Sequence, residues 1–178
     1  VVGAAGKTMT RAYPMKSVEG EQHDHPHHRG LNFGHEDIGG YDTWAEAATF
    51  GEGGKDPKRA AAYAERLKHL GVQKHREIKE MKGGADSGSL VVVIDYLDPS
   101  GKKIIEEERR MTFRVQGGVR MIDVDQDLVA SEGAVSFADK KDSGLSIRVP
   151  TEMCVQIEKD KKGNGTILNS EGHTNKDA

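Results

Sequence analysis

The spacing of apolar residues changes along the chain. Within residues 57–70, apolar side chains recur at every third or fourth position, which is the period of an amphipathic α-helix. Asp56 followed by Pro57 is a helix-start signal, and Gly71 stands where the helix should stop. The pattern therefore predicts one helix over these residues, within a helical insertion that spans residues 51–71.

After this helix the apolar period falls to two, and β-branched residues gather between turn signals. This pattern is typical of β-strands. The expected strands are Val72–Met81, Ser89–Leu97, Lys103–Val115, Val119–Ala130, Leu145–Val149 and Met153–Glu158. The turns at Asp98–Gly101 and Gly117–Gly118 are short enough to join neighbouring strands as antiparallel hairpins, so we expect a meander.

The mixture of many strands with one helix predicts a mostly β fold, an antiparallel β-sandwich, in preference to a doubly wound sheet. The 178 residues fit one domain that spans residues 1–178. The polar run at residues 169–178 contains no closing strand. We therefore expect either a disordered tail or a sandwich that is incomplete at its C-terminal end.

The strand expected at residues 119–130 separates its two faces. Its apolar residues share one face, and Asp123, Asp125 and Asp127 share the other. Three aspartates spaced two apart suggest a calcium site, but the glycine and the distal glutamate of the calcium-binding loop pattern are absent. We expect a solvated strand face.

Composition narrows the range of partners. The net charge of −3 and the isoelectric point near 6.3 give no basic face for nucleic acid or for an anionic membrane surface. The longest apolar run, Leu90–Ile94, is too short to span a membrane. The single cysteine, Cys154, excludes an internal disulfide and is expected to be a small buried side chain. A small-molecule ligand is the remaining partner class.

Histidine is concentrated near the amino end, where five of the eight histidines fall between His23 and His35. Imidazole ligates metals when neutral and exchanges protons near neutral pH, so such a cluster indicates metal binding or acid–base chemistry. In an extended backbone, His25 and His27 would point the same way, roughly 6.6 Å apart at Cα. His28 would then face the opposite side.

Neighbouring residues could complete a pocket. Arg29 offers a planar guanidinium suited to carboxylates or hydroxyls. Glycines at positions 30, 34, 39 and 40 permit turns that could bring His35 and Asp37 toward His25 and His27.

Other aromatic and imidazole side chains are less informative. Trp44 either packs in the core or stacks on a sugar ring. His23, His69 and His75 are expected on the solvated surface. The histidine spacing fits neither the zincin motif His-Glu-x-x-His nor the cupin pattern.

Several motifs resemble a known bacterial family. They are Thr10–Lys16, Asp24–Leu31, Phe33–His35, the Gly-x-Asp-x-Trp pattern at Gly40–Trp44, Val135–Asp139, Ile147–Val149 and Asn169–Gly172. On these residues the chain is identified as a member of the PmoA family, which is labelled methane oxygenase. Asn32, Gly39 and Thr43 depart from the family pattern, which has Trp, Asn and Phe there. The resemblance implies a galactose-mutarotase-like supersandwich and a periplasmic or extracellular location.

The histidines and the resemblance together predict a carbohydrate-active or carbohydrate-binding protein, and favour an enzyme. The expected catalytic residues are His25, His27, Arg29 and His35, and the expected substrate-binding residues are Asp24, His28, Asp37, Trp44 and Arg11. A divalent metal, if one is used, would be held by His25, His27 and His35. Two alternatives stay open: a copper- or iron-dependent oxygenase, and a non-catalytic module whose motif holds loops together.

Overall fold

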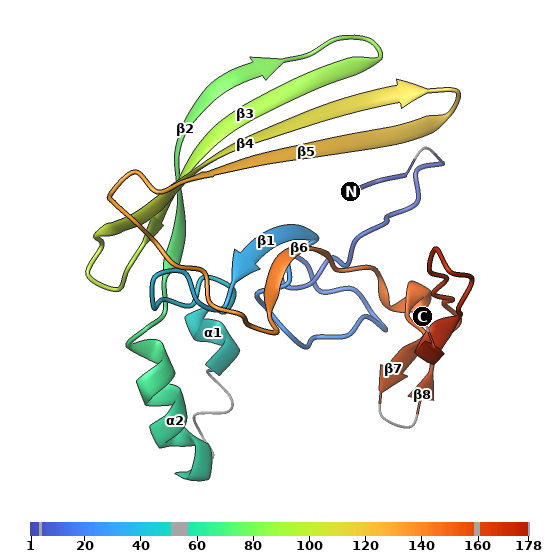
Figure 1. The fold of residues 1–178 in the computed structure, drawn as a ribbon. Coiled ribbons are helices and arrows are strands. Elements are labelled where there is room, and N and C mark those ends of the chain that lie inside the picture. The colour runs from blue at the N-terminus through green and yellow to red at the C-terminus, as the bar shows by residue number, and fades with distance from the viewer. Residues whose placement is uncertain (4, 51–56, 159–160, 178) are drawn as a thin grey trace. The chain divides into compact units, whose positions relative to one another are not determined.

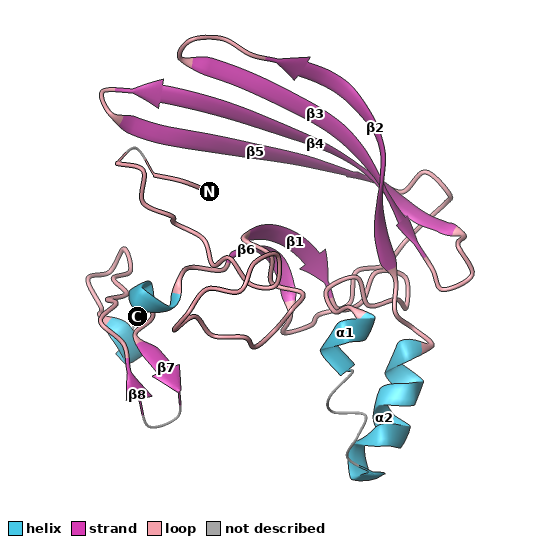
Figure 2. Cartoon of the chain, turned by 180° about the vertical axis from the view of Figure 1, so that it is seen from behind, coloured by secondary structure: helices cyan, strands magenta, loops and turns pink. Residues whose placement is uncertain are grey.

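The chain is mostly β, with antiparallel sheets and few helices (Figure 2), and this confirms the predicted fold class. The computed structural model describes residues 1–178 except residues 4, 51–56, 159–160 and 178. The chain divides into two compact units, one formed by residues 1–32 and 145–178 and the other by residues 33–144. No helix within the described residues is long and apolar enough to cross a membrane.

The unit formed by residues 33–144 is built on a four-stranded antiparallel meander in the order β2-β3-β4-β5 (Figure 1). Its strands are β2 (Val72–Lys82), β3 (Ser87–Leu97), β4 (Lys103–Gln116) and β5 (Val119–Val129). All four lie where the alternating pattern predicts them, and the hairpins turn at the two predicted sites. The buried residues of the meander lie on its two central strands, β3 and β4, whereas the edge strands β2 and β5 carry none.

The core of this unit lies at one end of the meander. Ile38, Tyr96, Ile104 and Ile105 form a buried cluster, with Phe33 among the half-buried side chains packed against it. At the edge strand β5 the aspartates at 123, 125 and 127 are exposed, as the solvated-face prediction requires. Asp123 forms an ion pair with Arg114 of the neighbouring strand β4.

Two helices precede the meander, α1 (Ala47–Phe50) and α2 (Pro57–Leu67). The predicted helix is confirmed, but it ends three residues early. The backbone of residues 69–71 instead bonds to Asp42, which donates to the His69 carbonyl at 2.8 Å and accepts from the Gly71 amide at 2.7 Å. The proposed N-cap Asp56 and the first part of the 51–71 insertion lie outside the described residues.

The remaining strands are short. β1 (Leu31–His35) pairs with β6 (Ser143–Ile147), and β7 (Gln156–Glu158) pairs with β8 (Lys161–Lys162). β6 begins and ends two residues before the prediction. The strand expected from residue 153 begins only at Gln156, and a 3₁₀ turn, Thr151–Met153, with Pro150 at its N-cap precedes it. A second 3₁₀ turn spans Asn175–Asp177.

Candidate functional site

The histidine motif forms a tight turn. The His28 amide donates to the His25 carbonyl at 3.0 Å, and His25 has a φ of 45°. Pro26 explains the turn, because proline presets the backbone angle required at the second position of a β-turn. The backbone is therefore not extended here, and the directions worked out for an extended backbone do not apply. His28 does not face away from His25, because the two rings stack with centroids 5.1 Å apart and planes 9° apart.

The turn gathers three imidazoles. The ring centroids of His25 and His27 lie 5.8 Å apart, and those of His27 and His28 lie 4.2 Å apart. His27 is only 8% exposed, whereas His25 is exposed and His28 is half-buried. Burial, followed by the nearby charges of the other two histidines and of two arginines, lowers the pKa of His28 from 6.5 to about 4.

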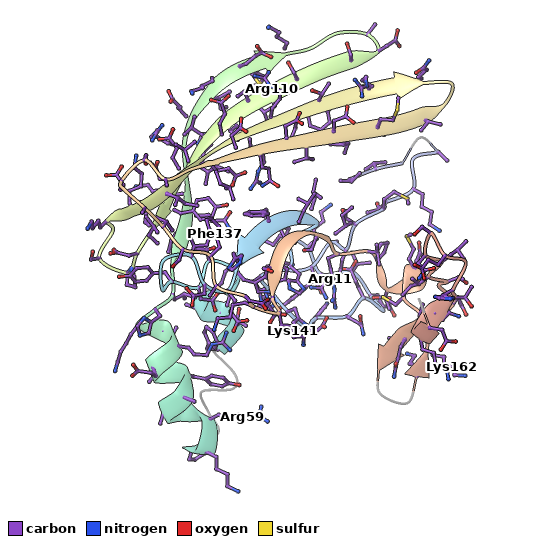
Figure 3. The ribbon with its side chains drawn as sticks, viewed as in Figure 1. Arg11, Arg59, Arg110, Phe137, Lys141 and Lys162 are labelled. Atoms are coloured by element: carbon purple, nitrogen blue, oxygen red, sulfur yellow. The ribbon has the colours of Figure 1, made fainter. Side chains whose placement is uncertain are left out.

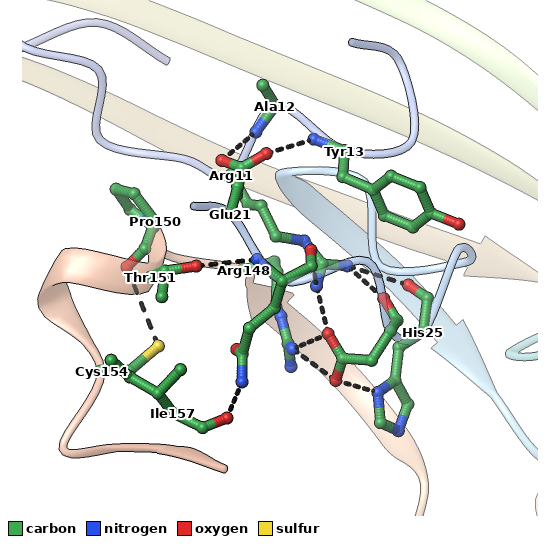
Figure 4. Close-up of polar contacts among 12 residues, drawn as sticks. Arg11, Ala12, Tyr13, Glu21, His25, Arg148, Pro150, Thr151, Cys154 and Ile157 are labelled. Atoms are coloured by element: carbon green, nitrogen blue, oxygen red, sulfur yellow. Dashed lines mark hydrogen bonds and ion pairs between the residues drawn. The ribbon is translucent and has the colours of Figure 1, made fainter. Parts of the chain in front are cut away.

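Asp24 anchors the turn through its carboxylate, whose partners Arg11, His25 and Arg148 are labelled in Figure 4. Oδ1 accepts from Arg11 Nη1 at 2.5 Å, and Arg148 Nη2 lies 2.7 Å from both carboxylate oxygens. Oδ2 lies 2.5 Å from His25 Nδ1. Burial alone would raise the pKa of Asp24, but hydrogen bonds from His25, Arg148 and Arg11, with the charge of Arg148, hold this pKa well below its usual range.

Arg11 fixes the loop from inside. Its side chain is 1% exposed, and its guanidinium also donates to the backbone carbonyls of Gln22, Asp24 and His25 at 3.2, 2.7 and 3.0 Å. These bonds satisfy carbonyls that a loop would otherwise leave without partners inside the protein. This placement suits a residue that positions the histidine turn more than one that contacts a substrate.

Arg148 is a site residue that sequence reasoning missed. Its amide donates to the Gly30 carbonyl at 2.7 Å, and its own carbonyl accepts from the Arg11 amide at 2.9 Å. The backbone thus sets Arg148 between the two ends of the loop, 124 residues along the chain from Asp24. The only signal was its place in the Ile147–Val149 motif, where nothing in the local pattern links it to the histidines.

Further hydrogen bonds attach the residues just before the histidine turn to other segments of the same unit. The Glu21 carboxylate accepts from the amides of Ala12 and Tyr13 at 2.8 and 2.9 Å. The Gln22 amide donates to Thr151 Oγ1 at 3.0 Å, and the Gln22 side chain donates to the Ile157 carbonyl. The histidine turn is therefore held by segments from both ends of the chain. His23 is exposed, as expected, and stacks on Tyr13 with centroids 4.7 Å apart.

Three of the predicted site residues lie in the other unit. His35 Nδ1 accepts from the Asp37 amide at 3.0 Å, and Asp37 Oδ1 accepts from the Gly40 amide at 2.9 Å. Gly39 and Gly40 have φ values of 61° and 91°, so the predicted tight turn is present. Trp44 is half-buried. Arg29, which follows the histidine turn in its own unit, is exposed.

The metal prediction receives no support from geometry. Across the described ranges, no group of three or more His, Cys, Asp or Glu side chains is placed to hold a metal ion. A shared metal at His25, His27 and His35 therefore stays a prediction, which elemental analysis of the purified protein can test.

Comparison with known proteins places the chain in a family. A model described as a family of unknown function, DUF6807, matches residues 1–178. The chain belongs to DUF6807. The resemblance to the PmoA family is therefore wrong, because the family found spans the whole chain and no PmoA match accompanies it. No curated protein and no solved structure is significantly similar to this DUF6807 chain. The expected periplasmic or extracellular location rested on the PmoA resemblance and loses that support.

Proposed function

We propose that this DUF6807 chain binds a sugar at the histidine turn and transfers a proton to or from it through His25. The observation that carries the proposal is the 2.5 Å contact between Asp24 Oδ2 and His25 Nδ1 on a half-exposed imidazole. A carboxylate bound to Nδ1 favours the tautomer that donates from Nδ1, which leaves Nε2 as a proton acceptor. This is the arrangement that a general base needs.

The neighbouring imidazoles suit a ligand rich in hydroxyl groups. With a pKa of about 4, His28 is neutral at pH 7. A neutral imidazole offers one hydrogen-bond donor and one acceptor, which matches the dual character of a hydroxyl. We assign His25 the proton transfer, the half-buried His28 the hydrogen bonding of hydroxyls, and the exposed Arg29 the orientation of the ligand. The buried His27 packs against both neighbouring imidazoles and supports them.

The proposal is tested by replacing His25 with asparagine. Asparagine tolerates the left-handed backbone found at this position, and its amide can donate to Asp24 as Nδ1 does, but it has no basic nitrogen. The assay follows anomeric interconversion and isomerisation of a panel of sugars by NMR. For any sugar that the wild type converts, we expect His25→Asn to lower the conversion rate by about 100-fold or more and to leave the melting temperature unchanged.

His69→Asn serves as the control, because His69 is an exposed histidine of the other unit. This variant should retain the full rate. Equal rates in wild type and His25→Asn, with any sugar that reacts, would refute proton transfer by His25.

The burial of Arg11 favours a second candidate, a non-catalytic module in which the motif holds loops together. A guanidinium that is 1% exposed and binds three backbone carbonyls stabilises a loop whether or not a ligand is present. If no sugar binds or reacts, and substitutions around Asp24 change only the stability, this candidate is correct.

A further inference from the structure

A hollow of about 590 Å³ lies at the carboxyl end of the unit formed by residues 1–32 and 145–178. Its walls come from the β7–β8 hairpin and from the segment of residues 174–177. Figure 3 labels Lys162 on β8, one of the residues that line it. Its volume falls within the range that is usual for small-molecule sites.

The lining of this hollow is cationic. Lys161, Lys162 and Lys176 all contribute to it, against one acidic residue, Asp177. Within the described ranges, none of the three lysines forms an ion pair or a side-chain hydrogen bond. Like charges around one hollow repel each other, and an anion in the hollow relieves that repulsion.

The walls are held in place by hydrogen bonds. The Asn169 side chain accepts from the amides of Glu171 and His173 at 3.0 and 2.9 Å, and Leu168 pairs with Thr174 in a β-bridge. Asn175 exchanges two bonds with Ile167, at 2.9 Å through its amide and 3.1 Å through its side chain. The segment that presents Thr174 and Lys176 is therefore shaped before any ligand arrives, which lowers the entropy cost of binding.

The facing wall is also fixed by its backbone. The Gly163 amide donates to the Val155 carbonyl at 2.8 Å, and the Gly165 amide donates to the Cys154 carbonyl at 2.9 Å. The same stretch of chain contacts the loop that carries the histidines, because Gln22 binds Thr151 and Ile157. The hollow and the histidine turn thus belong to one hydrogen-bonded unit.

We propose that this hollow binds the anionic group of an acidic saccharide, either a carboxylate or a sulfate ester. The lysines that line the hollow supply the charge recognition, and Thr174 and Gln156 supply polar groups for hydroxyls. The saccharide part of this inference rests on the proposed function, whereas the anion part rests on the lysines alone.

Calorimetric titration tests the inference with four probes at low salt. They are trigalacturonate, a sulfated galactose disaccharide, a neutral trisaccharide and inorganic phosphate. We expect one or both acidic saccharides to bind, the neutral trisaccharide to bind at least tenfold more weakly, and added salt to weaken the acidic probes through screening. Which acidic saccharide binds better identifies the anionic group.

The lysine variants give the matched comparison. Lys161→Gln/Lys162→Gln should weaken the acidic saccharide by about tenfold, and Lys176→Gln should weaken it by a smaller factor. The control is Lys140→Gln/Lys141→Gln, which removes the same charge from an exposed lysine pair of the other unit and should leave the affinity unchanged. Equal effects of the two double variants would overturn the inference.

Three further results would also overturn it: binding of the neutral trisaccharide as tight as that of the acidic probes, binding of phosphate alone, or no acidic probe bound at low salt. His25→Asn separates this inference from the proposed function. That variant should bind the acidic saccharide normally. If it also reacts normally, proton transfer by His25 is wrong while the hollow stands.

Discussion

Substitution of Glu107 on β4 most strongly tests what holds the meander together, because the Glu107 carboxylate is completely buried. The carboxylate accepts four hydrogen bonds, from Tyr96 Oη at 2.5 Å, Arg109 Nε at 2.5 Å, Arg109 Nη2 at 3.0 Å and Gln126 Nε2 at 2.8 Å. Burial, and then the charge of Glu107, raises the pKa of Tyr96, so the phenol stays protonated as a donor. The cluster joins β3, β4 and β5.

The predicted perturbation is Glu107→Gln, which keeps the shape but removes the charge. Removing one partner of a buried ion pair costs about 3–5 kcal/mol. The Arg109 side chain is 17% exposed, so water can partly solvate the guanidinium that loses its carboxylate. We therefore expect the free energy of unfolding to fall by about 3 kcal/mol, the lower end of that range. Tyr96→Phe, which removes one bond to a charged acceptor, should cost about 1.5–2 kcal/mol.

Urea unfolding measures both variants through the fluorescence of Trp44, the only tryptophan, which lies in the same unit as the cluster. The control is Glu106→Gln, because Glu106 is a more exposed carboxylate with ion pairs to Arg76 at 2.7 Å and Lys103 at 3.5 Å. Partly exposed pairs contribute less than about 1 kcal/mol. A loss below about 1 kcal/mol in Glu107→Gln, or an equal loss in Glu106→Gln, would refute the reasoning.

Three further predictions concern other parts of the molecule. The pKa of His28 is about 4 in the folded protein, compared with 6.5 for an unperturbed histidine. As the pH drops from 6.5 toward 4, the unfolded chain therefore takes up this proton before the folded protein does, and the free energy of unfolding should fall. Solvent screening limits this loss to about 1 kcal/mol, and denaturant titrations of His28→Asn should lack it. Arg148→Gln should cost about 1 kcal/mol and speed amide exchange at residue 28, because Asp24 loses two charged contacts. Gly34→Ala should cost about 1–3 kcal/mol in thermal unfolding, since its Cβ would lie 2.9 Å from a backbone oxygen, whereas Gly83→Ala meets nothing within 4 Å and should be near neutral.

The meander could be predicted because each of its strands and turns is marked by a pattern of neighbouring residues in the sequence. Alternating apolar residues and two short turn signals locate the strands β2 to β5 within two residues at each end. The burial of Glu107 could not be predicted in this way. It lies in a run of charged residues from Glu106 to Arg110, which looks like a solvated face until the strands are paired.

The candidate site was predicted only in part. The density of histidines located it, and His25, His27 and His28 do come together. Their relative orientation was not predicted, because it was worked out for an extended backbone, whereas Pro26 presets a β-turn. Arg148 was missed because no local pattern reports a partner so distant in the chain.

Asp24 shows why the structural and chemical roles of this motif need not compete. Its carboxylate is bound by the guanidiniums of both Arg11 and Arg148, which ties the histidine turn to two distant parts of the chain. The carboxylate also gives His25 its direction, since Oδ2 lies 2.5 Å from Nδ1, while Arg11 binds Oδ1 and Arg148 binds both oxygens. The bonds that hold the loop together are therefore the same ones that would aim Nε2 at a ligand. Loss of either arginine should weaken the loop and misdirect the imidazole together.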